Sequence, residues 1–457
     1  MRSVWAIAVN TIKQALRLRV AVVFIVLLGI LLPVMGYITT GDGTLKGKLQ
    51  TFTSYSLSLV TFLLSLLTII ISVYTLTSDI KYRQAYTVVT KPVRRFQVIL
   101  GKLAGVLILD AFLLVVFAGM IYSITVLIPH FSSAGQRQMS EAKDEFFTAR
   151  RHITPPEPEV EEQALKAYKE LKEAGELDQL LTQVTPSQIL KEIKNRQKLW
   201  LRSARPGQEL TWDFTGIDIR DPNKSLFIKF KYDVARQPVG SQIYGQWIVG
   251  DYRPLKYGEK PETPVYNFKR KDPVGTVREM KVPADAVADD GFLGITFLNP
   301  TLNNTVVIFP LEGGLELLYK ADSFTTNFCR SVVMIMLSLI FLGCLGFLAA
   351  SFLSFPVAIL LCLVVFFSGT ISGFILDSFE HLGRAMSVIY FYTIKPLVLL
   401  LPRFDEISPS HFMVSGKLLT WSLLGETAGI LVGVKSLLLL GLSLLIFTYR
   451  EIAKLII

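Results

Sequence analysis

The sequence predicts a polytopic α-helical membrane protein of six transmembrane helices, with an α+β extracytoplasmic domain that combines a helical hairpin and a β-sandwich. Three observations predict this fold class. The 457 residues are 51% hydrophobic with a mean hydropathy of +0.46, too apolar for an ordinary soluble protein. Several apolar runs are long enough to cross a bilayer. One long polar segment, residues 130–327, separates the first three of these runs from the others.

The formal charge of +10 raises the question of nucleic-acid binding. Much of the basic excess, however, flanks the apolar runs, so anionic membrane lipid and an acidic partner surface explain it better than nucleic acid. The three cysteines, Cys329, Cys344 and Cys362, all fall in apolar runs. They read as small hydrophobic residues, and neither a disulfide framework nor a metal site is predicted.

Residues 1–19 predict an amphipathic helix that lies in the membrane interface. Its apolar and polar sides are Trp5, Val9, Ile12 and Leu16 against Asn10, Lys13 and Arg17. Residues 20–129 then hold three transmembrane helices at about 20–37, 53–76 and 100–128. The third contains Asp110, which is costly in a membrane unless it is paired or faces water. Asp110 is either a gating or substrate-path residue or a structural hydrogen-bonding partner of a neighbouring span, and the structural interpretation is favoured.

The extracytoplasmic domain, residues 130–327, contains two parts that differ in their pattern of apolar and polar residues. Residues 130–205 are charged and helical, with helices expected over 141–150, 158–175 and 186–201. In the second of these, Leu165, Tyr168 and Leu171 are expected to pack inward. The charged run of residues 161–176 in the same helix is interpreted as a solvated face, with an interaction arm as the alternative.

Residues 206–320 alternate apolar and polar residues and predict a β-sandwich. The alternating series are 210/212/214, 226/228/230/232/234, 243/247/249 and 293/295/297. Trp212 and Trp247 suggest a sugar-binding platform, but both lie on the alternating, inward positions. Core packing is therefore the favoured interpretation for both.

Residues 328–457 hold the other three transmembrane helices. They are expected at 328–352, from a turn at 354–356 to about Asp377, and at 427–447. Between the last two, residues 385–405 are interpreted as an outer re-entrant segment, because the apolar stretch is short and contains Lys395-Pro396. Three G-x-x-x-G pairs, 101/105, 369/373 and 429/433, permit close helix contacts without naming the partner helices.

A basic loop, residues 78–99, joins the second and third spans. Six cations in or beside it face one acid, Asp79; they are Lys81, Arg83, Lys91, Arg94, Arg95 and Lys102. This excess predicts that the loop is cytoplasmic, which places both termini in the cytoplasm and residues 130–327 outside.

The run Thr90-Lys91-Pro92-Val93-Arg94-Arg95, followed by Gly101-Lys102, resembles the coupling loop of ABC-2-type exporter permeases. The similar members are six-span permeases of the nitrous-oxide-reductase maturation type. Many of them carry an acid near the position of Lys81, where this chain has a base. The resemblance covers the membrane portion in outline and offers no counterpart for the outer domain.

The resemblance implies a multi-pass inner-membrane permease that works as a homodimer or heterodimer. Its loop would dock on a separate ABC ATPase subunit, which binds ATP and magnesium, so this chain carries no cofactor and is not an enzyme. The implied docking residues are Tyr82, Tyr86, Lys91, Pro92, Arg94 and Arg95.

Two other classes compete with this interpretation. A membrane-anchored extracytoplasmic binding or scaffold protein would use the spans only to hold the outer domain. A membrane-embedded hydrolase is disfavoured, because the sequence shows no Ser/His/Asp set and no H-E-x-x-H spacing. Neither motif nor composition identifies the transported substrate.

Overall fold

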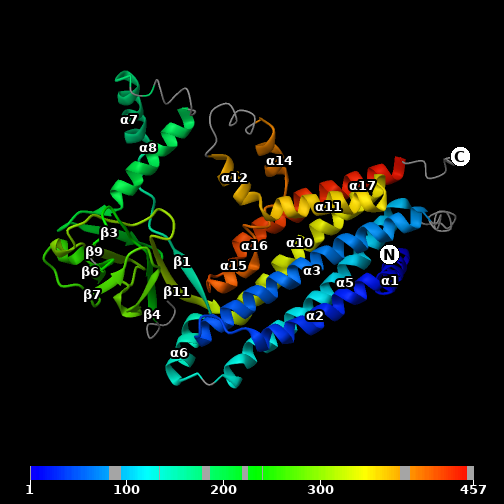
Figure 1. Ribbon diagram of the computed structural model, residues 1–457, viewed down its shortest axis with the longest axis horizontal. Helices are drawn as coiled ribbons and strands as arrows, with labels where there is room; N and C mark the ends of the chain where they lie inside the picture. Colours follow the sequence, from blue (N-terminus) through cyan, green and yellow to red (C-terminus); the bar gives the residue numbers. More distant parts are fainter. Residues whose placement is uncertain are drawn as a thin grey trace. The chain divides into compact units, whose positions relative to one another are not determined.

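The computed structural model describes residues 2–81, 94–132, 134–175, 177, 186–218, 225–238, 240–380 and 392–449. The chain forms two compact units, each with most of its residue contacts inside itself. The first combines Met1–Ala149, Ser323–Ser378 and Tyr392–Ile457, and the second is built around Arg150–Asp322. Figure 1 shows the long helices of the first unit and the strands of the second.

The first unit is helical. Its helices before the second unit are α1 (Arg2–Leu16), α2 (Arg19–Ile38), α3 (Leu45–Lys81), α5 (Arg95–Leu127), a 3-10 turn (Ile128–Phe131) and α6 (Gln136–Glu145). Its later helices are α10 (Phe324–Phe352), α11 (Phe355–Thr370), α12 (Ser372–Glu380), α14 (Ile394–Leu400), α15 (Pro409–Val414), α16 (Trp421–Thr427), a π-helical stretch (Ala428–Ser436) and α17 (Leu437–Tyr449).

Within the described residues, five helical segments are long and apolar enough to cross a membrane. They are Arg19–Ile38, Leu45–Ile80, Arg95–Phe131, Phe324–Phe352 and Trp421–Tyr449. Several membrane-spanning helices in one chain indicate a multi-pass membrane protein. The structure does not confirm six spans, because the helix expected fifth is a 16-residue apolar helix, α11, followed by a break.

The break after α11 comes from a distant carboxylate. Asp405 accepts a hydrogen bond from the Ser372 hydroxyl at 2.7 Å and another from the Gly373 backbone N–H at 2.6 Å. The Phe404 N–H donates to the Gly369 carbonyl at 3.0 Å. These bonds satisfy backbone N–H and carbonyl groups that a helix end leaves without partners. Helix α11 can therefore end at Thr370, and α12 begins at Ser372.

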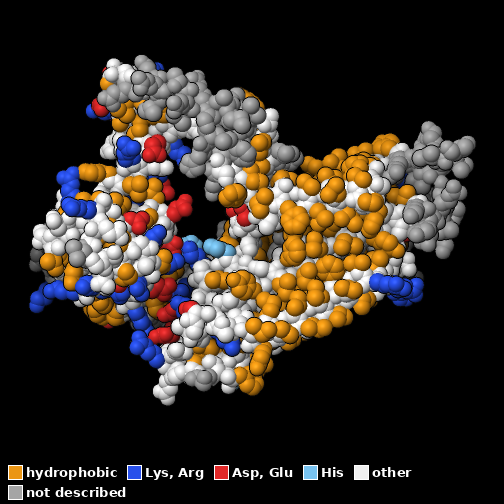
Figure 2. Space-filling model, viewed as in Figure 1, with side chains coloured by type: hydrophobic (Ala, Val, Ile, Leu, Met, Phe, Trp, Pro, Cys, Tyr) orange, Lys and Arg blue, Asp and Glu red, His pale blue; other side chains and the backbone are white. Residues whose placement is uncertain are grey.

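The centre of the first unit is formed by α3, α5 and α10, whose buried residues belong to one core. Their surroundings differ. In α10, 72% of the apolar stretch is buried, against 17% in α2. Figure 2 shows hydrophobic side chains covering the outer faces of the long helices. Such faces are suited to contact with lipid chains or other spans.

The three G-x-x-x-G pairs have different surroundings. A Cβ added to Gly105 would lie 2.6 Å from the Ala8 carbonyl oxygen, so α1 packs directly on α5 there. Gly369 faces the 402–404 segment and not a helix, with Pro402 O at 2.5 Å from an added Cβ. A Cβ at Gly429 would meet nothing within 4 Å. Only the first pair therefore makes the close helix contact that its spacing permits.

The second unit contains a helical hairpin and three sheets. Its helices are α7 (Glu161–Glu173), α8 (Pro186–Leu201) and the short α9 (Arg253–Lys256). Its strands are β1 (Thr148–Ile153), β2 (Ser203–Ala204), β3 (Glu209–Phe214), β4 (Ser225–Phe230), β5 (Asp233–Val234), β6 (Gln242–Gly250), β7 (Tyr266–Pro273), β8 (Arg278–Pro283), β9 (Leu293–Leu298), β10 (Val307–Ile308) and β11 (Leu315–Ser323). The sheet orders are β1-β11-β4-β8, β3-β9-β6-β7 and β2-β10-β5.

One aromatic core joins the two four-stranded sheets. Phe230 of β4 lies 4.6 Å from Trp247 of β6, and Trp247 lies 4.9 Å from Phe297 of β9, measured between ring centroids. Trp212 packs on Phe309 at 4.9 Å. Both tryptophans are buried, which confirms that they belong to the core and not to a sugar-binding platform.

Two predictions for the helical part are wrong. Leu165 does not pack inward; it is exposed, and Ala164 is buried instead. The hairpin is held by ion pairs, with Lys194 Nζ 2.6 Å from Glu161 Oε1 and Lys198 paired with Glu157. The helix expected over 141–150 ends at Glu145, because Thr148 starts β1 and joins a sheet.

Candidate functional site

The flanks of the basic loop meet through a buried ion pair. Lys102 Nζ of α5 lies 2.7 Å from Asp79 Oδ2 of α3 and donates a hydrogen bond to the Thr75 carbonyl at 2.8 Å. Only 5% of the Lys102 side chain and 14% of the Asp79 side chain are exposed. Lys102, counted above among the cations of the loop, is therefore neutralised locally, and it links the two helices that carry the loop.

Helix α1 is held at the same place. The Gln14 side-chain amide donates to the Ser78 hydroxyl at 3.0 Å, and Ser78 itself is buried. With the close approach at Gly105, this bond attaches α1 to both α3 and α5. Three helices thus converge on one end, at which α3 stops and α5 begins.

The two arginines after the loop have different surroundings. The Arg94 backbone N–H donates to the Gln97 side-chain oxygen at 3.1 Å, while the Arg94 side chain is exposed and pairs with no acid among the described residues. Arg95 Nη1 donates to the Thr448 carbonyl at 2.6 Å and so links α5 to α17. Arg94 is available to a partner, whereas Arg95 serves the fold. Tyr82, Tyr86, Lys91 and Pro92 lie outside the described residues.

Asp110 lies deeper between the same two helices. It is fully buried, and its Oδ2 accepts a hydrogen bond from the Thr68 hydroxyl at 2.9 Å. Its Oδ1 has no partner among the described residues. The bond to Thr68 is of the interhelical kind that the structural interpretation of Asp110 predicts.

Helix α3 carries a stripe of hydroxyl residues that the sequence-based interpretation of the spans did not include. Its members alternate at spacings of three and four residues: Thr51, Ser54, Ser58, Thr61, Ser65, Thr68, Ser72 and Thr75, with Asp79 next in the series. This spacing places them on one side of the helix. The later half of the stripe, from Ser65 to Thr75, is buried, whereas Ser58 is exposed. Thr68 contacts Asp110 there, and a Cβ added to Gly346 of α10 would lie 2.7 Å from the Ser72 Cβ. The signal was present in the sequence as small residues at a heptad spacing.

The described His, Cys, Asp and Glu side chains do not meet the requirements of a metal site. Among the described residues, no group of three or more His, Cys, Asp or Glu side chains is arranged to hold a metal ion. All three cysteines are free thiols, and Cys344 and Cys362 are buried.

A surface ion cluster marks the second unit. Arg253 lies 2.8 Å from Asp251 and 2.7 Å from Asp290, and its guanidinium stacks on the Phe292 ring at 4.0 Å. Hydrogen bonds from Arg253 hold the pKa of both carboxylates below their usual range. Nearby, burial and a hydrogen bond to Asp213 raise the pKa of Tyr252 to about 12. The cluster joins the segment at Asp251–Arg253 to the one at Asp290–Phe292 on the surface of the unit.

No protein-family model, curated protein or solved structure matches this chain.

Proposed function

We propose that this chain is the membrane-spanning permease subunit of an ATP-binding-cassette exporter, driven by a separate ATPase subunit that docks on the loop between α3 and α5. The observation that carries the proposal is the buried Lys102–Asp79 pair at the base of that loop. A loop that only connects two spans needs no such pair. A loop that receives force does, because a loose helix end would absorb the movement.

The contacts around the loop supply a route for that force. Lys102 joins α3 to α5, Gln14 joins α1 to α3, and Arg95 joins α5 to α17. A push on the loop therefore moves four helices together. ATP and magnesium belong to the ATPase, and this chain performs no catalytic step.

The proposed assembly is a homodimer or heterodimer of permease chains in the inner membrane, with both termini in the cytoplasm. Two membrane-spanning segments support a dimer because they are mostly uncovered by the rest of the chain. Only 17% of the apolar stretch of α2 and 22% of that of Trp421–Tyr449 are buried. The outer domain would shape the exit path for the substrate.

Charge reversal at Arg94 tests the proposal. Arg94→Glu places an acid where the ATPase would meet an exposed cation, and central arginine contacts are worth about 2 kcal/mol or more, roughly thirtyfold in affinity. We expect the co-purifying ATPase to be lost and ATP hydrolysis in membranes to uncouple from the permease. The control is Arg137→Glu on α6, which makes the same charge change at an exposed arginine outside the loop and breaks only a surface ion pair with Glu141. Unchanged association in a correctly inserted Arg94→Glu variant would contradict the coupling role.

A membrane-anchored extracytoplasmic binding or scaffold protein is the second candidate. The observation that favours it is the complete aromatic core of the second unit, which gives that unit its own means of folding. Such a protein would have no ATPase partner and would tolerate Arg94→Glu. An ATPase gene beside the gene for this chain would favour the exporter.

A further inference from the structure

Two cavities adjoin where α1 passes into α2. The larger, with a volume of about 530 Å³, lies between α2, α3 and the corner from α10 to α11. The smaller, about 320 Å³, lies along α1. Leu18 and Tyr74 line both cavities, so the two are neighbours that one ligand can occupy together. Volumes of roughly 300–1,000 Å³ are typical of small-molecule sites.

The smaller cavity is polar and positively charged. It is lined by Asn10, Lys13, Gln14 and Arg17 in addition to the shared pair. Lys13 and Arg17 are exposed and lie one helical turn apart, and neither forms an ion pair with a described residue. Among the described residues, no acid lines either cavity, and the nearest acid along α3, Asp79, is already paired with Lys102. No described side chain therefore compensates the charge on this cavity.

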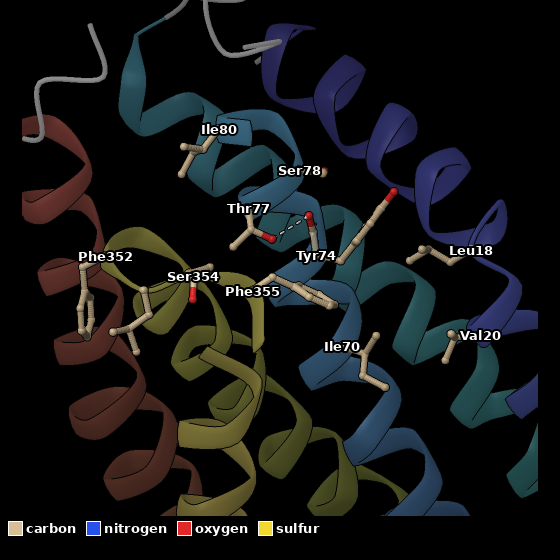
Figure 3. A pocket seen from close by; sticks show the side chains of 12 residues that line it. Leu18, Val20, Ile70, Tyr74, Thr77, Ser78, Ile80, Phe352, Ser354 and Phe355 are labelled. Atoms are coloured by element: carbon tan, nitrogen blue, oxygen red, sulfur yellow. Dashed lines mark hydrogen bonds between the residues drawn. The ribbon is translucent and has the colours of Figure 1, made fainter. Parts of the chain in front are cut away.

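The larger cavity is apolar. Figure 3 shows Val20 on one side, Phe352 on the other, and Ile70, Tyr74 and Phe355 between them. The Tyr74 and Phe355 rings meet edge to face at 6.1 Å. Two of the hydroxyls in the wall are used locally: Thr77 donates to the Val73 carbonyl at 2.7 Å, and Ser78 accepts from Gln14. The interior is thus suited to a hydrocarbon chain.

We propose that this site binds an anionic glycerophospholipid, with its phosphate on Lys13 and Arg17 and one acyl chain in the apolar cavity. A phosphate is recognised by charge-assisted hydrogen bonds from both cations. A soluble anion would leave the apolar cavity unfilled, and a zwitterionic lipid would bring its own cation toward Lys13 and Arg17. The site lies where an amphipathic helix leads into a membrane span, which is the level of lipid headgroups.

Retention of lipid by the full chain tests the site without reference to transport or to an ATPase. The protein is delipidated in detergent, and phosphatidylglycerol or phosphatidylcholine is added back. Bound lipid is counted by native mass spectrometry. We expect phosphatidylglycerol to be retained in preference to phosphatidylcholine. Lys13→Gln with Arg17→Gln should weaken that retention about 25-fold, since each cation near an anionic headgroup contributes about fivefold.

Two matched variants separate this site from general electrostatics. Lys48→Gln with Lys143→Gln removes the same charge at residues that line neither cavity and should change retention less than about twofold. Ser354→Phe fills the apolar cavity without changing charge, and the Ser354 side chain makes no helix-cap hydrogen bond that would be lost. It should also lower phosphatidylglycerol retention. Equal retention of the two lipids by the wild-type chain would overturn the proposal, as would equal losses in the two charge variants or displacement of lipid by inorganic phosphate.

Discussion

The two units of this chain have different centres, although both bury some polar groups. In the first unit, polar groups lie in the deepest helix contacts, where Asp110 is fully buried and Lys102 pairs with Asp79. In the second unit the centre is aromatic, around Trp247. Its charged cluster lies at the surface, with 42% of the Arg253 side chain exposed.

The difference follows from what surrounds each unit. Between membrane helices, exchanging lipid chains for leucine side chains gains little, so helix pairing depends on close approach and on hydrogen bonds. In water, burial of apolar area provides the main driving force for packing. The centre of the second unit can therefore be held by apolar burial, with buried polar groups such as Asn299 bonded to nearby backbone carbonyls. The first unit uses polar contacts to define which helices meet.

Truncation at the aromatic centre should produce the largest effect. Trp247→Ala removes a fully buried ring from the core, and we expect it to cost about 3–5 kcal/mol in the free energy of unfolding of the second unit. The measurement is urea unfolding of residues 147–323, followed by circular dichroism; wild-type protein should unfold in one cooperative transition. Trp200→Ala, at an exposed tryptophan, is the control and should cost under about 1 kcal/mol. Equal costs for the two variants would refute an aromatic centre.

Breaking the buried ion pair should produce the second largest effect. Lys102→Met leaves Asp79 without its cation and should cost about 3 kcal/mol, near the lower end for buried pairs because Asp79 is partly exposed. Lys102→Met combined with Asp79→Leu removes both charges and should recover most of that cost. Unfolding in bicelles provides the measurement. A double variant as unstable as the single one would show that the pair acts through packing and not through charge.

Individual helices and strands could be predicted where the residues of a single stretch decide its structure. The apolar run predicted at 20–37 is α2, and the one at 328–352 lies within α10, because the length and composition of a span are local properties. The alternating residues 293, 295 and 297 are buried in β9 for the same reason, since period two defines one face of a strand.

Contacts between distant residues could not be predicted in this way. The fifth expected span is interrupted by Asp405, which lies 33 residues beyond Ser372 in the sequence. Arg95 was grouped with Arg94 as a docking residue, yet it contacts a carbonyl 353 positions away. The ion pair of Lys102 with Asp79 had no local signal either. Composition identifies the residues able to form such bonds, but the chain's topology selects the partners.

Two glycine substitutions test whether helix pairing in the first unit depends on close approach. Gly105→Ala should push α1 from α5, because its new methyl group would lie 2.6 Å from a backbone oxygen that cannot move aside cheaply. We expect a net cost of about 1–2 kcal/mol, in which overpacking exceeds the gain in helix propensity. Gly429→Ala has the same local motif and open space around it, so it should be neutral or slightly stabilising. Thermal unfolding of the two variants in detergent measures the difference, and equal midpoints would show that α1 does not pack closely on α5.

Removing the Arg253 cluster should produce the smallest effect, because Arg253 and Asp290 are largely exposed. Hydrogen bonds from Arg253 depress the pKa of Asp251 and Asp290 in the folded state. A depressed folded pKa contributes stability above the ordinary carboxyl pKa of about 4, and this stability is lost as pH falls through the lower folded value.

Arg253→Gln should therefore be less stable than wild type at pH 7, and the difference should shrink below pH 4. Arg236→Gln, at an exposed arginine without an ion pair among the described residues, is the control and should keep the wild-type slope of stability against pH. Urea midpoints of residues 147–323 at pH 7, 4 and 3 measure both slopes. Identical slopes for Arg253→Gln and wild type would mean that solvent screens the cluster completely. This cluster would then contribute nothing to the stability of the second unit, in contrast to the buried Lys102–Asp79 pair of the first.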